Sequence, residues 1–146
     1  MLKHLASLSF FLVFVVATLA SAGDSAGDLM AMQGDWEVVS LVEKTKAVPA
    51  EEIAALSVHF EKDVFTVKEK GKALVQYQIK LDPTKSPKAI DFTHIGGENK
   101  GKTELGIYSI DGKQLKLVLD EERKGRPTAF DGKETADYSV FTLKQK

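Results

Sequence analysis

The sequence contains no cysteine among its 146 residues. This absence excludes disulfide bonds, thiolate metal ligands and a lipid anchor on an N-terminal cysteine. A domain built from this chain must therefore be stabilised by the packing of its side chains.

The sequence also lacks an excess of charge of either sign. Twenty basic and 21 acidic residues give a formal net charge of −1. Nucleic-acid binding normally needs a basic face, so the composition gives no support to a nucleic-acid partner. Internal repeats and low-complexity tracts are absent as well.

Long apolar runs are missing except near the N-terminus. There, Lys3 precedes an apolar stretch from Leu8 to Leu19, and the small residues Ala20-Ser21-Ala22 follow it. The stretch is shorter than the ~20 residues that a spanning helix needs. This pattern predicts a cleaved signal peptide over residues 1–22, with an uncleaved N-terminal anchor as the alternative. After cleavage we expect a soluble exported protein, periplasmic or extracellular, without membrane insertion.

Alternating apolar and polar residues dominate the rest of the chain and predict an all-β domain over residues 34–146. Before it, residues 23–33 are expected to form a flexible leader and a short helical turn capped by Asp28. A second helical segment is predicted over residues 49–56. The eight predicted strands cover residues 36–42, 58–61, 65–68, 73–81, 90–92, 105–110, 114–119 and 137–144.

The lengths of the connections favour an eight-stranded up-and-down antiparallel barrel. Three long connections, over residues 44–55, 95–103 and 121–136, fall at one end, which we expect to be an elaborated mouth. At the opposite end, Asp111-Gly112 predicts a tight hairpin turn. Closing the sheet would pair the first strand with the last and remove both open edges.

The segment Gly34-Asp35-Trp36 resembles the start of the first strand in the lipocalins. In that family the tryptophan packs at the closed base of the barrel, and a basic side chain of the last strand covers it. The resemblance thus implies a structural role for Gly34, Trp36 and Lys144, with Lys144 placed over the indole face. Lysine replaces the usual arginine at this position.

A more extended resemblance covers nearly all of the chain beyond the predicted signal peptide. The chain is similar to a family of small exported lipocalin-like proteins, known mainly from planctomycete genomes, whose function is uncharacterised. The resemblance implies a lipocalin-like barrel and no particular activity. Many members carry a cysteine after the Asp-Gly hairpin, which this chain lacks. The similar segments are residues 32–36, 81–91, 106–112 and 126–130.

Aromatic residues on the predicted strands could line a cavity, because an eight-stranded barrel can hold one small ligand. In this interpretation Phe60, Phe65, Tyr77 and Phe92 form the cavity wall. Arg123 and Arg126, in the longest connection, would bind an anionic head group at the mouth. The equally simple alternative is that the aromatic side chains fill a solid core.

The sequence shows no arrangement of residues that predicts catalysis. His59 and His94 lack the spacing of metal ligands, and no nucleophile motif or phosphate-binding loop is present. We therefore expect no cofactor, no metal and no enzymatic activity. The leading hypothesis is an exported module that binds a small apolar or amphipathic molecule. A non-catalytic structural or interaction domain with a filled core ranks second, and a hydrolase ranks last.

Overall fold

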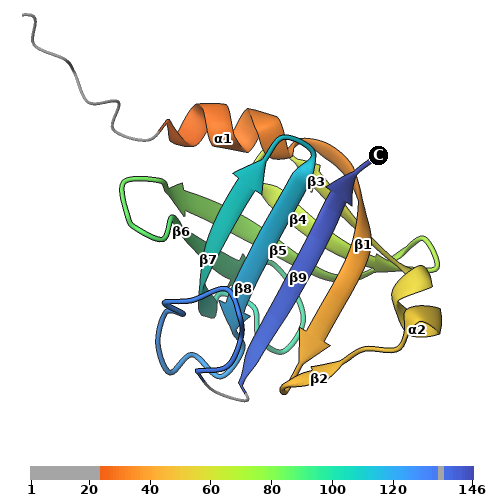
Figure 1. Ribbon diagram of the computed structural model, residues 1–146. Helices are drawn as coiled ribbons and strands as arrows, with labels where there is room; N and C mark the ends of the chain where they lie inside the picture. Colours follow the sequence, from red (N-terminus) through yellow and green to blue (C-terminus); the bar gives the residue numbers. More distant parts are fainter. Residues whose placement is uncertain (1–23, 135–136) are drawn as a thin grey trace, which may run out of the picture.

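The computed structural model describes residues 24–134 and 137–146, and β-strands make up most of them (Figure 1). The predicted signal peptide lies outside the described residues. The helices are α1 (Ser25–Met32) and α2 (Ala50–Ala54). The strands are β1 (Gly34–Glu43), β2 (Lys46–Ala47), β3 (Leu56–Glu61), β4 (Val64–Glu69), β5 (Lys72–Asp82), β6 (Ala89–His94), β7 (Thr103–Asp111), β8 (Gln114–Asp120) and β9 (Tyr138–Gln145).

The long strands form one closed antiparallel barrel, which confirms the predicted fold class. From β3 to β9 each strand pairs with the next one in sequence, and β1 pairs with both β3 and β9. All eight predicted strands are present. The two-residue strand β2, which the sequence did not predict, pairs with the end of β1.

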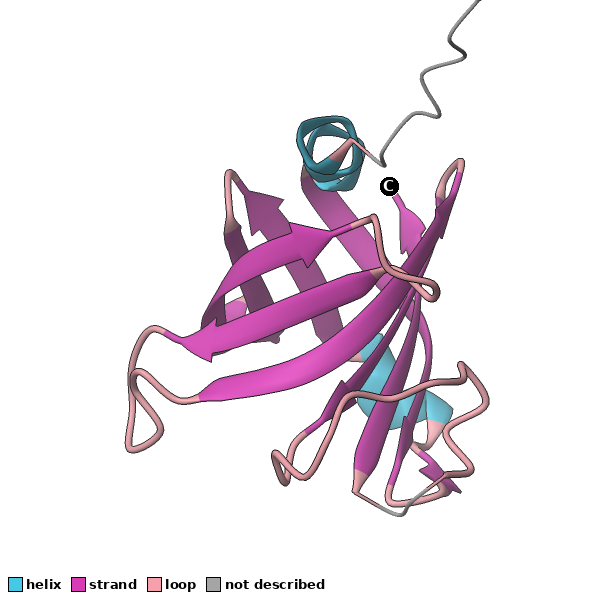
Figure 2. Cartoon of the chain, turned by 90° about the vertical axis from the view of Figure 1, so that its left-hand side faces the viewer, coloured by secondary structure: helices cyan, strands magenta, loops and turns pink. Residues whose placement is uncertain are grey.

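The two ends of the barrel differ as the loop lengths predicted. The tight turns β3–β4 and β7–β8 lie at one end together with α1, and we call this the closed end (Figures 1 and 2). At the opposite, open end lie α2, residues 95–102 and the long segment 121–134. Neither helix of the described part has the length and apolar character needed to cross a membrane.

A β-bulge in β1 places apolar residues on both faces of this strand. The register against β9 shifts between Val38 and Ser40. The shift turns Leu41 into the core beside Val38 and leaves Val39 52% exposed on the outside. One extra residue therefore reverses the alternation halfway along the strand.

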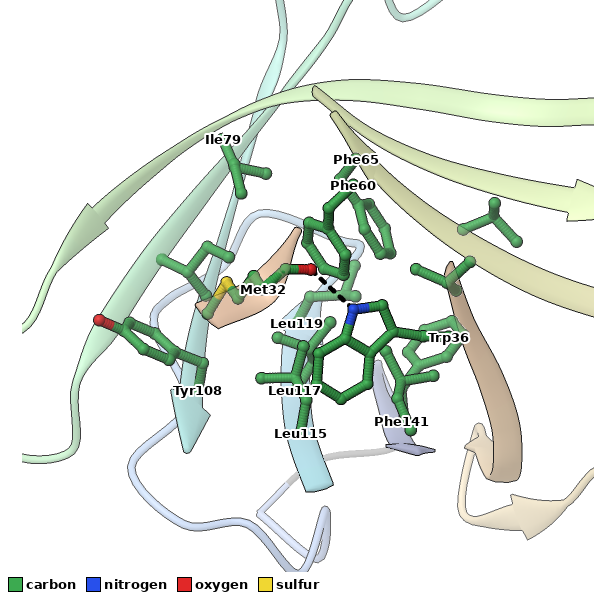
Figure 3. Packing of buried hydrophobic residues seen from close by; sticks show 14 of the residues in the cluster. Met32, Trp36, Phe60, Phe65, Ile79, Tyr108, Leu115, Leu117, Leu119 and Phe141 are labelled. Carbon is green, nitrogen blue, oxygen red and sulfur yellow. Dashed lines mark hydrogen bonds between the residues drawn. The ribbon is translucent and has the colours of Figure 1, made fainter. Parts of the chain in front are cut away.

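Helix α1 closes one end of the barrel, where its last residue, Met32, joins Trp36 of β1 in the core; both side chains are fully buried (Figure 3). The indole Nε1 of Trp36 donates a 2.7 Å hydrogen bond to the carbonyl oxygen of Met32. Between them the chain turns sharply at Gly34, whose φ of +100° favours glycine. Lys144 does not cover the indole. It pairs with Glu37 in the β1–β9 ladder and is exposed on the opposite face.

Asp28 has a different role from the predicted helix cap. Residues 25–27, expected to be part of a flexible leader, form the first turn of α1, and Asp24 occupies the N-cap position. Asp28 accepts a 2.7 Å hydrogen bond from the Tyr108 hydroxyl and lies 2.8 Å from Lys88 Nζ. Burial raises the pKa of Asp28, but the hydrogen bonds from Lys88 and Tyr108 outweigh it, so the pKa is lowered. These contacts fasten α1 to β7.

The substitution Asp28→Asn should destabilise the fold by about 1–3 kcal/mol at neutral pH, because it weakens charge-assisted hydrogen bonds. Because the pKa of Asp28 is lowered in the folded state, its ionised carboxylate stabilises the fold at pH values above the ordinary pKa of 3.8. The difference in free energy of unfolding between the parent and the variant should therefore shrink as the pH falls through 3.8 and then through the folded-state pKa. Urea unfolding at several pH values measures this difference. The matched control Asp24→Asn should change stability little, and an equal loss there would contradict the assigned role.

Candidate functional site

A cavity of about 180 Å³ opens at the open end of the barrel. It exceeds the roughly 150 Å³ of an engineered apolar cavity that binds benzene. Most of its wall is aliphatic or aromatic, and two carboxylates stand among the lining residues. The lining residues are Leu41, Glu43, Leu56, Phe65, Val67, Leu74, Val75, Tyr77, Leu119, Glu121 and Phe141.

The four aromatic residues predicted to line a cavity form one connected cluster. Ring centroids are 5.0 Å apart for Phe60 and Phe65, and 5.5 Å apart for both Phe65–Phe92 and Tyr77–Phe92. Phe65 and Tyr77 line the cavity. Phe60 and Phe92 are 1% and 0% exposed and belong to the packed core. The interior is therefore filled towards the closed end and hollow towards the open end.

A buried pair of polar side chains, His94 and Glu104, lies beside this aromatic cluster, and we call this pair the buried polar group. His94 Nε2 is 2.6 Å from Glu104 Oε1, and both side chains are more than nine-tenths buried. The His94 ring also packs on Tyr77, with 4.5 Å between centroids. The Glu104 carboxylate also interacts with the Tyr77 hydroxyl, although no donor among the described residues lies in good hydrogen-bond geometry to its Oε2.

The surroundings shift the pKa values of this polar group. Burial raises the pKa of Glu104 above its ordinary value of 4.5, although the hydrogen bond from His94 opposes the effect. Burial also raises the pKa of Tyr77, and the negative charges of Glu104 and Glu121 add to the increase. Tyr77 therefore stays protonated and can donate a hydrogen bond at any physiological pH.

Two further carboxylates stand at the rim of the cavity. Glu43 ends β1 and Glu121 directly follows β8. Burial raises the pKa of Glu43, and repulsion from Glu121 and Glu52 raises it further. Glu121 accepts a hydrogen bond from the hydroxyl of Ser139. The open end of the barrel thus concentrates negative charge around an apolar hollow.

The two arginines predicted at the mouth lie in different places. Arg123 reaches the polar group, with its Nη2 3.9 Å from Glu104 Oε1. Arg126 lies on the outer wall and does not line the cavity. Its guanidinium donates hydrogen bonds to the carbonyl oxygens of Ile90 and Gly106 and pairs with Asp91 at 2.7 Å. The prediction of an arginine pair for an anionic head group is therefore wrong for Arg126.

Arg126 instead holds the long segment 121–134 against the barrel. Ile90 and Gly106 are partners in the β6–β7 ladder, so one guanidinium bridges two strands. Nearby, a small apolar cluster outside the barrel is packed by Phe130. Its buried members are Ile107, Val118, Tyr138 and Val140.

Glu104 is the residue of the site that the sequence interpretation missed. The alternation in β7 places it on the inward face with Gly106 and Tyr108, so a charged residue on an otherwise apolar face was the available signal. A Cβ on Gly106 would lie 2.5 Å from the Val118 carbonyl oxygen and 3.0 Å from the Phe92 ring. The interior beside Gly106 is therefore tightly packed.

The two histidines do not form a common site. His59 lies on β3, 2.8 Å from Asp35, in an exposed contact, whereas His94 belongs to the buried polar group. Asp91 and His94 face opposite sides of β6, because side chains three residues apart on a strand point to opposite faces.

No protein-family model matches the chain, and the comparisons with curated proteins and with solved structures found no match either.

Replacing Arg126 should loosen the long segment. Arg126→Ala should destabilise the protein by about 1–3 kcal/mol, because buried carbonyl oxygens lose a charged donor. Arg126→Lys should recover only part of the loss, because one ammonium cannot reproduce the planar fork of donors. Urea unfolding and amide exchange of residues 121–134 measure both effects. The neighbouring substitution Lys124→Ala should change little, since Lys124 is 67% exposed. Unchanged exchange in Arg126→Ala would refute the bridging role.

Proposed function

We propose that this protein is a binding module that holds one small, largely apolar molecule in the cavity at the open end of its barrel. The cavity itself carries the proposal, because a mainly apolar hollow beside a few polar groups is the usual form of a small-molecule site. The closed barrel is compatible with this role, as eight strands leave room for one small ligand.

The dimensions of the hollow limit the ligand class. Typical pockets for drug-sized ligands measure about 300–1,000 Å³, well above the volume of about 180 Å³ found here. The packed core around Trp36, Met32 and Phe60 leaves no depth for a long chain. A single ring or a short branched chain therefore fits, with any polar end directed to the rim.

The setting that we propose for this role is outside the cytoplasm. It is supported by the signal-peptide pattern of residues 1–22. The resemblance to exported lipocalin-like proteins supports the same setting. Fold alone does not define function, so the proposal depends on the site.

Toluene is a suitable first probe, because its volume matches the cavity. We expect saturable binding with a Kd of about 1 mM or lower, consistent with the affinity that so few carbon atoms can provide. Chemical-shift changes in ¹H–¹⁵N spectra should concentrate on the strands that line the cavity.

The substitution Val75→Phe should abolish this binding, because Val75 lines the hollow and a larger ring would fill it. The matched control Val39→Phe places the same ring on the outside of β1 and should leave toluene binding unchanged. Thermal unfolding confirms that both variants fold. A parent protein that gives no saturable shifts would overturn the proposed function.

A further inference from the structure

We propose that the cavity selects a planar aromatic ring over a saturated ring of similar bulk. This inference rests on the proposed function, because it names the class of ligand for the same site. Aromatic side chains on two opposing walls of the hollow carry the inference, together with the buried polar group that orients one of them.

Aromatic side chains line the cavity from opposite sides of the barrel. Phe65 and Tyr77 are cross-strand partners in the β4–β5 ladder, and both line the cavity. Phe141, which also lines it, lies on β9. In the closed barrel the paths β5–β6–β7–β8–β9 and β5–β4–β3–β1–β9 contain the same number of steps, so β5 and β9 form opposite walls. A small molecule that enters the hollow therefore has aromatic side chains on both sides.

The aromatic wall on β4 and β5 is held in place by further ring contacts. The ring centroid of Tyr77 lies 5.9 Å from that of Phe65 and 5.5 Å from that of Phe92. The planes of the Phe65 and Tyr77 rings differ by 32°, so the two rings share roughly one orientation. Such a wall needs little reordering when a ligand binds, and preorganisation of this kind favours affinity.

The buried polar group fixes the orientation of Tyr77. The Tyr77 hydroxyl interacts with the carboxylate of Glu104, which His94 Nε2 holds at 2.6 Å. The His94 ring also packs on the Tyr77 ring at 4.5 Å between centroids. A buried tyrosine hydroxyl needs a hydrogen-bond partner, so the contact with Glu104 sets the direction of the ring that borders the hollow. Glu104 and His94 are thus positioning residues, which act on the ligand through Tyr77.

Aromatic rings attract one another beyond the contribution of buried area. Their charge distribution favours offset-stacked and edge-to-face pairs. The wall already contains edge-to-face pairs, because the Phe92 ring is inclined by 61° to Phe65 and by 72° to Tyr77. A saturated ring of similar bulk gains the same burial without this attraction. The difference amounts to about two- to tenfold in the dissociation constant.

Three neutral probes test this preference with the full chain: toluene, methylcyclohexane and cyclopentane. The saturated rings bracket toluene in size, since methylcyclohexane is bulkier and cyclopentane is smaller. Each dissociation constant is measured from ¹H–¹⁵N chemical shifts and corrected for the partition of the probe between water and hexadecane, which removes the hydrophobic contribution. After this correction, toluene should bind about two- to tenfold more tightly than either saturated ring.

The substitution Phe141→Leu should reduce the preference, because it replaces the aromatic ring on the β9 wall by an aliphatic side chain. We expect the corrected preference for toluene to fall by about twofold or more, whereas cyclopentane should still bind. The matched control Phe130→Leu removes a ring that packs outside the barrel and should leave the preference unchanged. Thermal unfolding shows whether each variant folds.

Glu104 provides a test of the positioning role. Glu104→Leu removes the acceptor of the Tyr77 hydroxyl and should lower the preference for toluene by about twofold or more. Glu104→Gln keeps a carbonyl oxygen as the acceptor and should restore most of the preference. General destabilisation would weaken the binding of all three probes alike, so the ratio of their affinities separates positioning from loss of structure.

The bound toluene gives a measurement that needs no variant. Ring currents of the aromatic walls should move its proton resonances upfield, and unmoved resonances would contradict the inference. Equal corrected affinities for toluene and the saturated rings would overturn the aromatic preference and leave the proposed binding function intact. If none of the three probes binds, the proposed function falls and the inference falls with it.

Discussion

The pairing of β1 with β9 is the constraint on which the rest of the structure depends. This ladder joins the first and last strands, removes both free edges and turns a meander into a barrel with two distinct ends. Without it, Trp36 could not be enclosed between α1 and the strands. Closure also brings Glu43, Ser139 and Glu121 together at one rim, although they are far apart in the sequence.

The difference between the two ends follows from how each is covered. At the closed end, α1 places Met32 over the core and its backbone oxygen receives the indole of Trp36. At the open end, the long segment 121–134 is held on the outer wall by Arg126 and leaves the interior uncovered. The hollow therefore lies where no helix or loop fills the barrel.

Local patterns in the sequence were sufficient to predict the eight long strands and their order in the barrel. Alternation with period two is a local property, and so are the turn signals that set the loop lengths. The bulge in β1 was not predictable in this way, because it depends on the register against β9. Asp28 and Arg126 were misassigned for a related reason. Their partners, such as Tyr108 and Gly106, are distant in sequence and meet them only after the barrel closes.

The aromatic part of the candidate site was predictable from the sequence, but its acidic side chains were not. The aromatic residues indicated an interior cluster, whereas Glu104 fell just outside the predicted strand over residues 105–110 and so was not assigned to the inward face. Intermolecular nuclear Overhauser effects between bound toluene and the protein test the central claim most directly. The account predicts contacts with the methyl groups of Leu41, Val67 and Leu119, which line the cavity. Contacts with Ile107 and Val140, on the outside of the barrel, would contradict it.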